Sequence, residues 1–186
     1  MLYNQVRIIG GKWRSRKLNF PDSEGLRPTL DRLRETLFNW LSLSIHGATC
    51  LDAFAGSGAL GFEAISRGAK KVVMLEKASV AFKALETNVS ALDAKEAVLL
   101  KTDTLFFLQK TDEQFDIIFL DPPFKDNLLN ACLNLIQQKN LLYPLGKIYI
   151  EYSNQQIINI PAEFKVIKEI LGGQVNIFLL EYTNRG

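Results

Sequence analysis

The chain has 186 residues, of which 47% are apolar and 23% charged, and its formal net charge is +2. This balance fits one compact domain with an extension, and it excludes a disordered, collagen-like or low-complexity chain. No apolar stretch is long enough to span a bilayer and the N-terminus lacks an apolar signal region, so we expect a soluble, cytoplasmic protein with no membrane partner.

Few side chains are available for metal binding or nucleophilic catalysis. Cys50 and Cys132 are the only cysteines, and they form neither a CxxC pair nor a cluster with metal-ligand spacing. Both lie among apolar neighbours, so we expect buried free thiols in a reducing compartment. His46 is the only histidine, which argues against a Ser-His-Asp triad and against a histidine metal site. We therefore expect no metal.

Residues 1–28 form the first predicted unit, a basic hairpin or arm. Gly10-Gly11 is a turn signal between two weak strand signals, which come from Val6, Ile8, Leu18 and Phe20. Residues 1–35 hold eight basic and four acidic side chains and carry +4, whereas the rest of the chain carries −2. Positive charge gathered at one end is typical of a polyanion-binding edge, although a solvated basic hairpin gives the same count.

A helix is predicted over residues 29–42. Thr29 follows a proline and is a candidate N-cap. Asp31, Arg34 and Glu35 fall off the apolar face of the helical wheel, whereas we expect Trp40 in the core. The apolar face consists of Leu30, Leu33, Leu37 and Leu41.

From residue 49 onward, strand and helix patterns alternate, which implies a parallel sheet with helices on both faces. The last two strands are joined by Gly172-Gly173 and must be antiparallel, because a parallel pair needs a long crossover. We therefore predict an α/β fold: a Rossmann-like class I methyltransferase domain over 29–186, mostly parallel with a C-terminal antiparallel hairpin, plus the basic N-terminal extension. The strands are expected at 49–54, 71–76, 97–101, 115–120, 147–151, 165–170 and 175–182, and the helices at 59–67, 78–92, from 104, and 127–138.

A glycine loop, Asp52-Ala53-Phe54-Ala55-Gly56-Ser57-Gly58, follows the first of these strands and opens a helix. Gly56 and Gly58 permit a tight turn and close approach of a ligand to the backbone, and the helix start offers free N–H groups. Glu76 lies 20 residues after Gly56, where a dinucleotide enzyme places its ribose-binding acid. These residues fit NAD and S-adenosylmethionine equally, since both ligands contain an adenosine ribose. Phe54 lies within the loop and is a further cofactor-binding candidate.

Two acids at strand ends extend the cofactor hypothesis. Asp52 precedes Gly56 by four positions, where a carboxylate would repel a pyrophosphate but suits the cationic amino and sulfonium groups of S-adenosylmethionine. We therefore expect S-adenosylmethionine, with a helix or turn cap as the alternative role for Asp52. Asp103 ends the third strand and is expected to accept a hydrogen bond from the adenine amino group, to N-cap the helix at Thr104, or both.

Asp121-Pro122-Pro123-Phe124 is the most specific motif and follows the most apolar strand of the chain. Asp121 and the Pro122 carbonyl can each accept one N–H of an exocyclic base amine and aim its lone pair at a methyl donor. Phe124 can stack on the base, which contributes ~1–3 kcal/mol. The motif therefore predicts methyl transfer to an amino group of a nucleic-acid base without a covalent intermediate.

The sequence resembles the RsmD-type 16S ribosomal RNA guanine-N2 methyltransferases from about Arg7 to Tyr182. The resemblance rests on the N-terminal block from Arg7 to Arg16, on Arg27-Pro28-Thr29 leading into residues 34–41, on the glycine loop and on the tetrapeptide. Two positions depart from the family pattern. Phe124 stands where many relatives have Tyr, and Ser15 stands where Gly is expected, which weakens the predicted turn.

The resemblance implies one guanine of 16S rRNA as acceptor, within an assembled or assembling small ribosomal subunit. It implies that Thr29 and Arg27 help to close the site, with Thr29 on the cofactor side. It also implies that the basic N-terminal segment contacts RNA. Trp13 is a candidate for stacking on RNA, with a hairpin core role as the alternative. The RNA-binding candidates are Arg7, Lys12, Trp13, Arg14, Arg16, Lys17 and Arg27.

Other functions remain open from the sequence. Adenine N6 in DNA or RNA also offers an exocyclic amine to the tetrapeptide. An NAD-dependent oxidoreductase would explain the glycines and Glu76, but not Asp52 or the tetrapeptide. A non-catalytic RNA-binding protein on the same fold would leave a complete cofactor loop unexplained.

Overall fold

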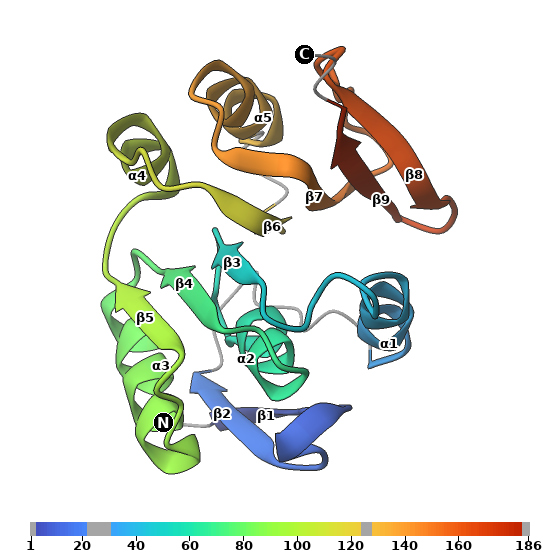
Figure 1. The fold of residues 1–186 in the computed structure, drawn as a ribbon. Coiled ribbons are helices and arrows are strands. Elements are labelled where there is room, and N and C mark those ends of the chain that lie inside the picture. Colours follow the sequence, from blue (N-terminus) through green and yellow to red (C-terminus); the bar gives the residue numbers. More distant parts are fainter. Residues whose placement is uncertain (1–2, 22–30, 124–127, 184–186) are drawn as a thin grey trace.

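A seven-stranded sheet runs through the centre of the computed structural model, which describes residues 3–21, 31–123 and 128–183 (Figure 1). The strand order is β5-β4-β3-β6-β7-β9-β8; the first five are parallel, and β9 is antiparallel to both neighbours. The predicted α/β sheet with a C-terminal antiparallel hairpin is therefore confirmed. The strands are β3 (Thr49–Asp52), β4 (Lys71–Leu75), β5 (Ala97–Leu100), β6 (Phe115–Leu120), β7 (Leu142–Ser153), β8 (Phe164–Ile170) and β9 (Val175–Tyr182).

Helices cover both faces of the sheet (Figure 1). Side chains of a strand alternate between faces, so Ile117 and Phe119 of β6 pack with one helix layer, and Ile118 and Leu120 pack with the other. Both faces of β6 are thus buried along Ile117–Leu120, which explains why these four residues are all apolar. The first layer contains α1 (Asp31–Trp40), α2 (Ala59–Ser66) and α3 (Ser79–Leu92), and the second contains α4 (Thr104–Lys110) and α5 (Leu129–Gln138).

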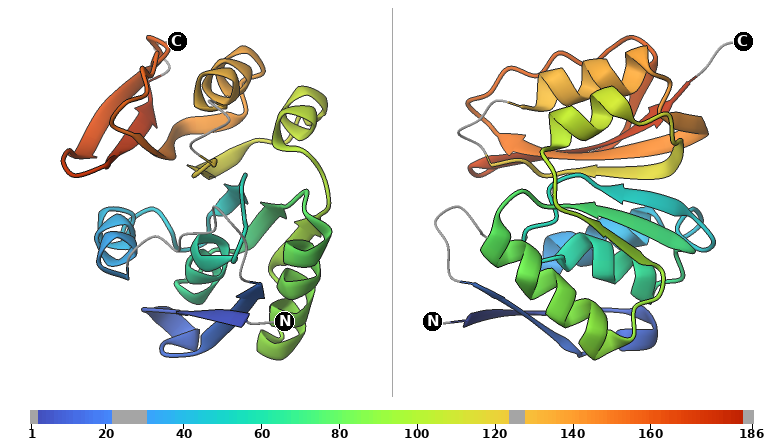
Figure 2. Two further views of the ribbon diagram at one scale, coloured as in Figure 1. Left: turned by 180° about the vertical axis from the view of Figure 1, so that it is seen from behind. Right: turned by 90° about the vertical axis from the view of Figure 1, so that its left-hand side faces the viewer.

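The N-terminal residues form an antiparallel hairpin of β1 (Tyr3–Arg7) and β2 (Lys17–Pro21), with a 3-10 turn at Gly11–Trp13. The hairpin lies outside the layer of α1, α2 and α3, on the side away from the sheet (Figures 1 and 2). Its apolar side chains, including Val6 and Phe20, belong to the same core as that helix layer. Whether residues 1–28 act as a distinct RNA-binding unit stays a prediction.

Arg34 differs from what the helical wheel indicates. Its side chain is completely buried, and its Nη2 donates to the Arg7 carbonyl at 2.8 Å and to Asp31 Oδ1 at 2.6 Å. The wheel describes only the periodicity of the helix itself, whereas here a strand distant in sequence contacts the polar side of the helix. β7 also extends beyond the predicted 147–151 at both ends: Leu142 pairs with Phe115 of β6, and β9 pairs with β7 as far as Ser153.

Ser15 occupies a left-handed backbone conformation, with φ of 69°, at the position where the resemblance led us to expect glycine. Its N–H donates to the Ile8 carbonyl at 2.9 Å, so the turn requires this conformation. Because a Cβ atom is disfavoured there, Ser15→Gly should stabilise the protein by about 1 kcal/mol. Urea unfolding at equilibrium measures this. Ser90→Gly, within helix α3, is the control and should destabilise by roughly 0.5–1 kcal/mol. A lower free energy of unfolding for Ser15→Gly would contradict the inference that the backbone at Ser15 is strained.

Candidate active site

The predicted site residues follow the carboxyl ends of four neighbouring parallel strands: β5, β4, β3 and β6. Backbone hydrogen bonds join the segments that leave these strands: Ala53 N to the Phe119 carbonyl at 3.1 Å, and Ala55 N to the Leu75 carbonyl at 2.9 Å. The structure therefore brings Asp52, Glu76, Asp103 and Asp121 to one edge of the sheet, the edge where open α/β sheets bind ligands.

The glycine loop has a shape that side chains would prevent. Gly56 and Gly58 have φ values of 49° and 79°, in the left-handed region. A Cβ atom on Gly58 would lie 2.5 Å from the Phe62 ring and 2.8 Å from a Leu85 methyl group. Gly58 is also the N-cap of α2, so the loop ends where the free N–H groups of a helix begin. The turn and close packing expected of these glycines are thus present.

Asp52 lies beneath this loop and is 2% exposed. Its Oδ2 accepts a hydrogen bond from Gly61 N in the first turn of α2 at 2.9 Å, which is the capping role considered as an alternative. Burial, with a smaller contribution from the Glu76 charge, raises the pKa of Asp52 to about 7, although backbone hydrogen bonds from Gly61 and Phe54 oppose the shift. A buried carboxylate whose charged form is disfavoured in this way fits the addition of a positively charged ligand.

Glu76 and Asp103 both bind backbone N–H groups in this structure. Glu76 accepts from Gly56 N at 3.0 Å and from Ala78 N at 2.7 Å, so it braces the glycine loop. Asp103 is exposed and N-caps α4, accepting from Phe106 N at 3.2 Å. The capping role of Asp103 is therefore observed, and its contact with adenine stays a prediction. Both carboxylates retain lone pairs for further donors.

The tetrapeptide begins where β6 ends. Asp121 is half-buried, Pro122 is buried and Pro123 is exposed. Phe124, Thr29 and Arg27 lie outside the described residues. The Asp121 and Pro122 acceptors thus come directly after a strand that is packed on both faces, which holds them in place.

Glu151, near the end of β7, is a site candidate that the sequence patterns did not single out. Its side chain is 8% exposed and accepts a hydrogen bond from the Tyr149 hydroxyl at 2.9 Å. Burial, together with the charges of Glu151 and Asp121, raises the pKa of Tyr149 well above its ordinary value. The sequence feature that identified Asp52 could also have identified Glu151, because both are acids at the carboxyl end of an apolar parallel strand.

Neither cysteine fits nucleophilic chemistry. Cys50 and Cys132 are free and buried, as expected. Burial raises the pKa of the Cys50 thiol, and it raises the pKa of Cys132 to about 12. Since the thiolate is the reactive form, both groups are poor nucleophiles near neutral pH. Within the described ranges, no three His, Cys, Asp or Glu residues gather in a way that could hold a metal ion, and no helix is long and apolar enough to cross a membrane.

The hairpin is fixed to α2 by backbone hydrogen bonds to a buried carboxylate. Glu63 is fully buried and accepts from Ile9 N at 2.7 Å and from Gly10 N at 2.9 Å, and it also pairs with Arg67. A Cβ atom on Gly11 would lie 1.8 Å from the Ser66 carbonyl oxygen, so only glycine permits this approach. The hairpin is therefore held in one position on the helix layer.

The basic side chains of the hairpin differ in their surroundings. Arg7 pairs with Asp31 at 2.9 Å and Lys12 pairs with Glu96, so acids offset two of the charges. Arg14, Arg16 and Lys17 are exposed; Arg16 also donates to the Ala91 carbonyl at 3.1 Å.

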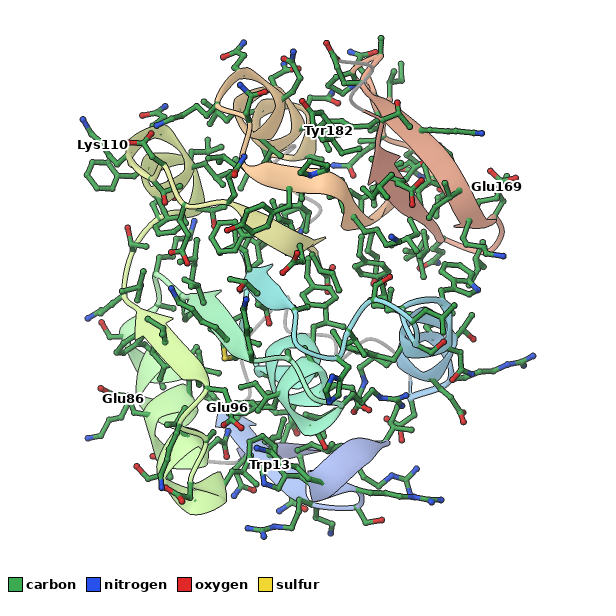
Figure 3. All side chains as sticks on the ribbon, in the orientation of Figure 1. Trp13, Glu86, Glu96, Lys110, Glu169 and Tyr182 are labelled. Atoms are coloured by element: carbon green, nitrogen blue, oxygen red, sulfur yellow. The ribbon has the colours of Figure 1, made fainter. Side chains whose placement is uncertain are left out.

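Trp13 is 9% exposed and lies in the core, with Lys12 Nζ 4.4 Å from its ring centroid. Its backbone N–H donates to Ser66 Oγ at 2.9 Å, and Figure 3 shows it at the hairpin, on the same side of the molecule as Glu96. The structure therefore shows the core role for Trp13, which was the alternative to stacking on RNA.

The family model described as Conserved hypothetical protein 95 matches residues 6–181. The chain belongs to this family. A relative from Haemophilus influenzae named Ribosomal RNA small subunit methyltransferase D is 44% identical over 181 residues, which cover 95% of this chain and 94% of the relative. An Escherichia coli relative of the same name is 42% identical over 183 residues, covering 98% and 92%. These findings confirm the RsmD-type resemblance.

Solved structures share the architecture of this family member. Escherichia coli yhhF superposes with a TM-score of 0.90 at 39% identity, covering 98% of this chain and 100% of that one. A Thermus thermophilus 16S rRNA guanine-N2 methyltransferase in complex with AdoMet and guanosine shares the fold, with a TM-score of 0.70 at 23% identity over 97% of this chain and 50% of that one. The predicted class I methyltransferase fold is thus confirmed, and the NAD-dependent oxidoreductase is not favoured.

Proposed function

We propose that this chain transfers a methyl group from S-adenosylmethionine to the exocyclic N2 of a guanine in 16S rRNA of the small ribosomal subunit. The observation that carries the chemistry is the position of Asp121 and Pro122, directly after β6 and beside the glycine loop after β3. The relative at 44% identity, named for small-subunit ribosomal RNA methylation, supports the substrate class. Adenine N6 in DNA or RNA would suit the tetrapeptide, but nothing in the relatives' names favours it.

S-adenosylmethionine supplies an electrophilic methyl group on a sulfonium centre. The buried carboxylate of Asp52 favours the cationic methionine portion, and the narrow turn at Gly56 and Gly58 lets that portion approach the backbone. Glu76 would accept the two ribose hydroxyls, and Asp103 would accept the adenine amino group. Phe54, half-buried beside these groups, and Thr29 complete the proposed cofactor contacts.

The target amine is a poor nucleophile, since its lone pair is delocalised into the base. Asp121 and the Pro122 carbonyl each accept one amine N–H, which orients the lone pair and stabilises the positive charge that develops on nitrogen. Phe124 stacks on the base, which must be unpaired or flipped out of a helix to reach the site. No covalent bond to the protein forms in this reaction.

The exposed basic side chains of the hairpin would contact RNA phosphates. Five of the proposed RNA-binding side chains are exposed: Arg7, Lys12, Arg14, Arg16 and Lys17, of which Arg7 and Lys12 also pair with acids. Arg27 is the remaining basic member of the proposed set. Because Glu63 fixes the hairpin to α2, these charges stand at a defined position relative to the glycine loop that opens α2. A rigid placement of this kind positions a substrate more accurately than a mobile arm does.

Neutralising two of these charges should weaken RNA binding uniformly. Replacing Arg14 and Lys17 by Gln should reduce the slope of log affinity against log salt by about 1 for each phosphate that the protein no longer neutralises. The control is Lys165→Gln, which removes an exposed charge from β8 at the far end of the sheet (Figure 1). Filter binding of 16S rRNA over a salt series measures the slope. An unchanged slope in the double variant would remove the hairpin from the proposed RNA face.

We infer that the substrate is an assembled or assembling small subunit in the cytoplasm. The test is transfer of labelled methyl from S-adenosylmethionine to small subunits lacking their guanine-N2 methylations, in parallel with deproteinised 16S rRNA. Label in the particles but not in the free RNA is the expected result. Label in free RNA alone would contradict the particle as substrate. No label in either, with a control methyltransferase active on the same samples, would contradict the proposed function.

A further inference from the structure

Glu151 stands one strand away from the tetrapeptide. Strands β6 and β7 are parallel, with Leu120 beside Ile150, so Asp121 and Glu151 follow at the same level of neighbouring strands about 4.8 Å apart. Along β7, Tyr149 packs with the α1–α3 layer and Ile150 packs with the opposite layer. By alternation Glu151 faces the α1–α3 side, the same side as Tyr149 and as Phe119, which pairs with Asp52 across β3 and β6.

The surroundings of Glu151 hold its carboxylate in one orientation. The side chain is 8% exposed, and the buried Tyr149 hydroxyl donates to its Oε2. Tyr149 is itself fixed by an edge-on contact with Phe119, with ring centroids 6.4 Å apart. An ionised carboxylate offers about four acceptor positions, so it can accept from the Tyr149 hydroxyl and from a donor on a ligand at the same time. A buried, oriented acid at the ligand edge of the sheet suits a ligand that donates hydrogen bonds.

Guanine presents two adjacent kinds of donor on its Watson–Crick edge, the N2 amine and the N1–H. Adenine has a lone pair at N1 instead. We propose that Glu151 is a specificity-determining residue that accepts the N1–H of the target guanine, while Asp121 and Pro122 hold its N2 amine; this rests on the function proposed above. A base with a lone pair at N1 would face the carboxylate without a donor, and sites built to hydrogen-bond a group reject analogues that lack it.

The test compares guanine with 2-aminopurine, which keeps the exocyclic amine at C2 but has a lone pair at N1. The target guanine is first mapped on wild-type product. Small subunits are then reconstituted with either base at that position, and kcat/KM is measured for each. The wild-type protein should prefer guanine. The ratio of interest is kcat/KM for guanine divided by kcat/KM for 2-aminopurine. Glu151→Gln should reduce this ratio at least about tenfold, mainly by lowering activity on guanine. The Gln amide can also donate a hydrogen bond to the N1 lone pair of 2-aminopurine.

Tyr149→Phe is the matched control, because it removes the hydroxyl that contacts Glu151 and keeps the carboxylate. Because the carboxylate remains but loses the donor that orients it, the ratio should fall clearly less in Tyr149→Phe than in Glu151→Gln, even where both activities fall. Equal losses of Glu151→Gln on both substrates, including loss of both activities, would overturn the assignment and indicate a structural role. A Tyr149→Phe ratio that changes as much as that of Glu151→Gln would do the same. A wild-type protein that methylates no guanine would instead defeat the proposed function itself.

Discussion

Asp121→Ala should lower kcat/KM on small subunits by about 10²–10³-fold, because it removes one of the two acceptors that orient the amine and stabilise its developing charge. The affinity for S-adenosylmethionine should change by less than about twofold, since the proposed cofactor contacts belong to the segments after β3, β4 and β5. Initial rates with labelled donor and calorimetric titration of S-adenosylmethionine measure the two quantities separately.

Two variants complete the Asp121 experiment. Asp121→Asn retains one side-chain oxygen acceptor, so it should keep more activity than Asp121→Ala. Asp112→Ala removes an exposed acid just before β6, and it should leave the rate unchanged. Full activity of Asp121→Ala in folded protein would contradict the proposed role of the tetrapeptide.

The affinity for S-adenosylmethionine should rise with pH up to about 7 and then level off. Burial raises the pKa of Asp52 to about 7. A raised pKa means that the free protein favours the neutral acid, so this group's contribution to folding stability is lost as pH rises from about 4 to about 7. A cationic ligand favours the ionised acid and lowers its pKa. Between about pH 5.5 and 7 the affinity should therefore increase by up to about tenfold per pH unit.

Asp52→Asn is the variant that isolates this effect. It cannot ionise, so its affinity should be weaker at pH 7 and nearly independent of pH over the same range, in which the ligand's α-amino group stays mainly protonated. Calorimetric titrations in two buffers of different ionisation enthalpy should also show proton release by the wild-type protein and none by Asp52→Asn. A wild-type affinity that does not change with pH would assign Asp52 to capping α2 alone.

The parts of the fold that the sequence predicts well are those whose patterns are local. β6 is a strongly apolar run over 115–120, interrupted only by Asp116, and the structure has it over the same residues. Two features depend on distant segments and were not predicted. β7 is longer than its apolar run, because β6 pairs with it at Leu142 and β9 pairs with it as far as Ser153. Arg34 is buried, because the hairpin backbone at Arg7 lies against its helix. A helical wheel cannot show a partner that comes from another part of the chain.

The candidate site was predictable because strand ends can be recognised in the sequence. Asp52, Glu76, Asp103 and Asp121 each follow an apolar strand, and parallel strands end at the same edge of a sheet. Glu151 also lies near the end of an apolar parallel strand, so the same rule could have identified it. It was not singled out, because it belongs to no sequence motif, whereas Asp121 on the neighbouring strand begins the tetrapeptide. Trp13 is a residue whose surroundings the sequence did not reveal. Its basic neighbours suggested an exposed ring, whereas the helix layer buries it. Flanking charge alone therefore does not predict which side of a hairpin faces solvent.

The most direct test of the central claim is the identity of the methylated nucleoside. Small subunits lacking their guanine-N2 methylations are incubated with the protein and methyl-labelled S-adenosylmethionine, and the RNA is digested to nucleosides and separated against standards. Label in N2-methylguanosine is the predicted result, because it identifies donor, base and acceptor atom together. Label in N6-methyladenosine would contradict the guanine assignment and the role of Glu151, while keeping the chemistry of Asp121 and Pro122.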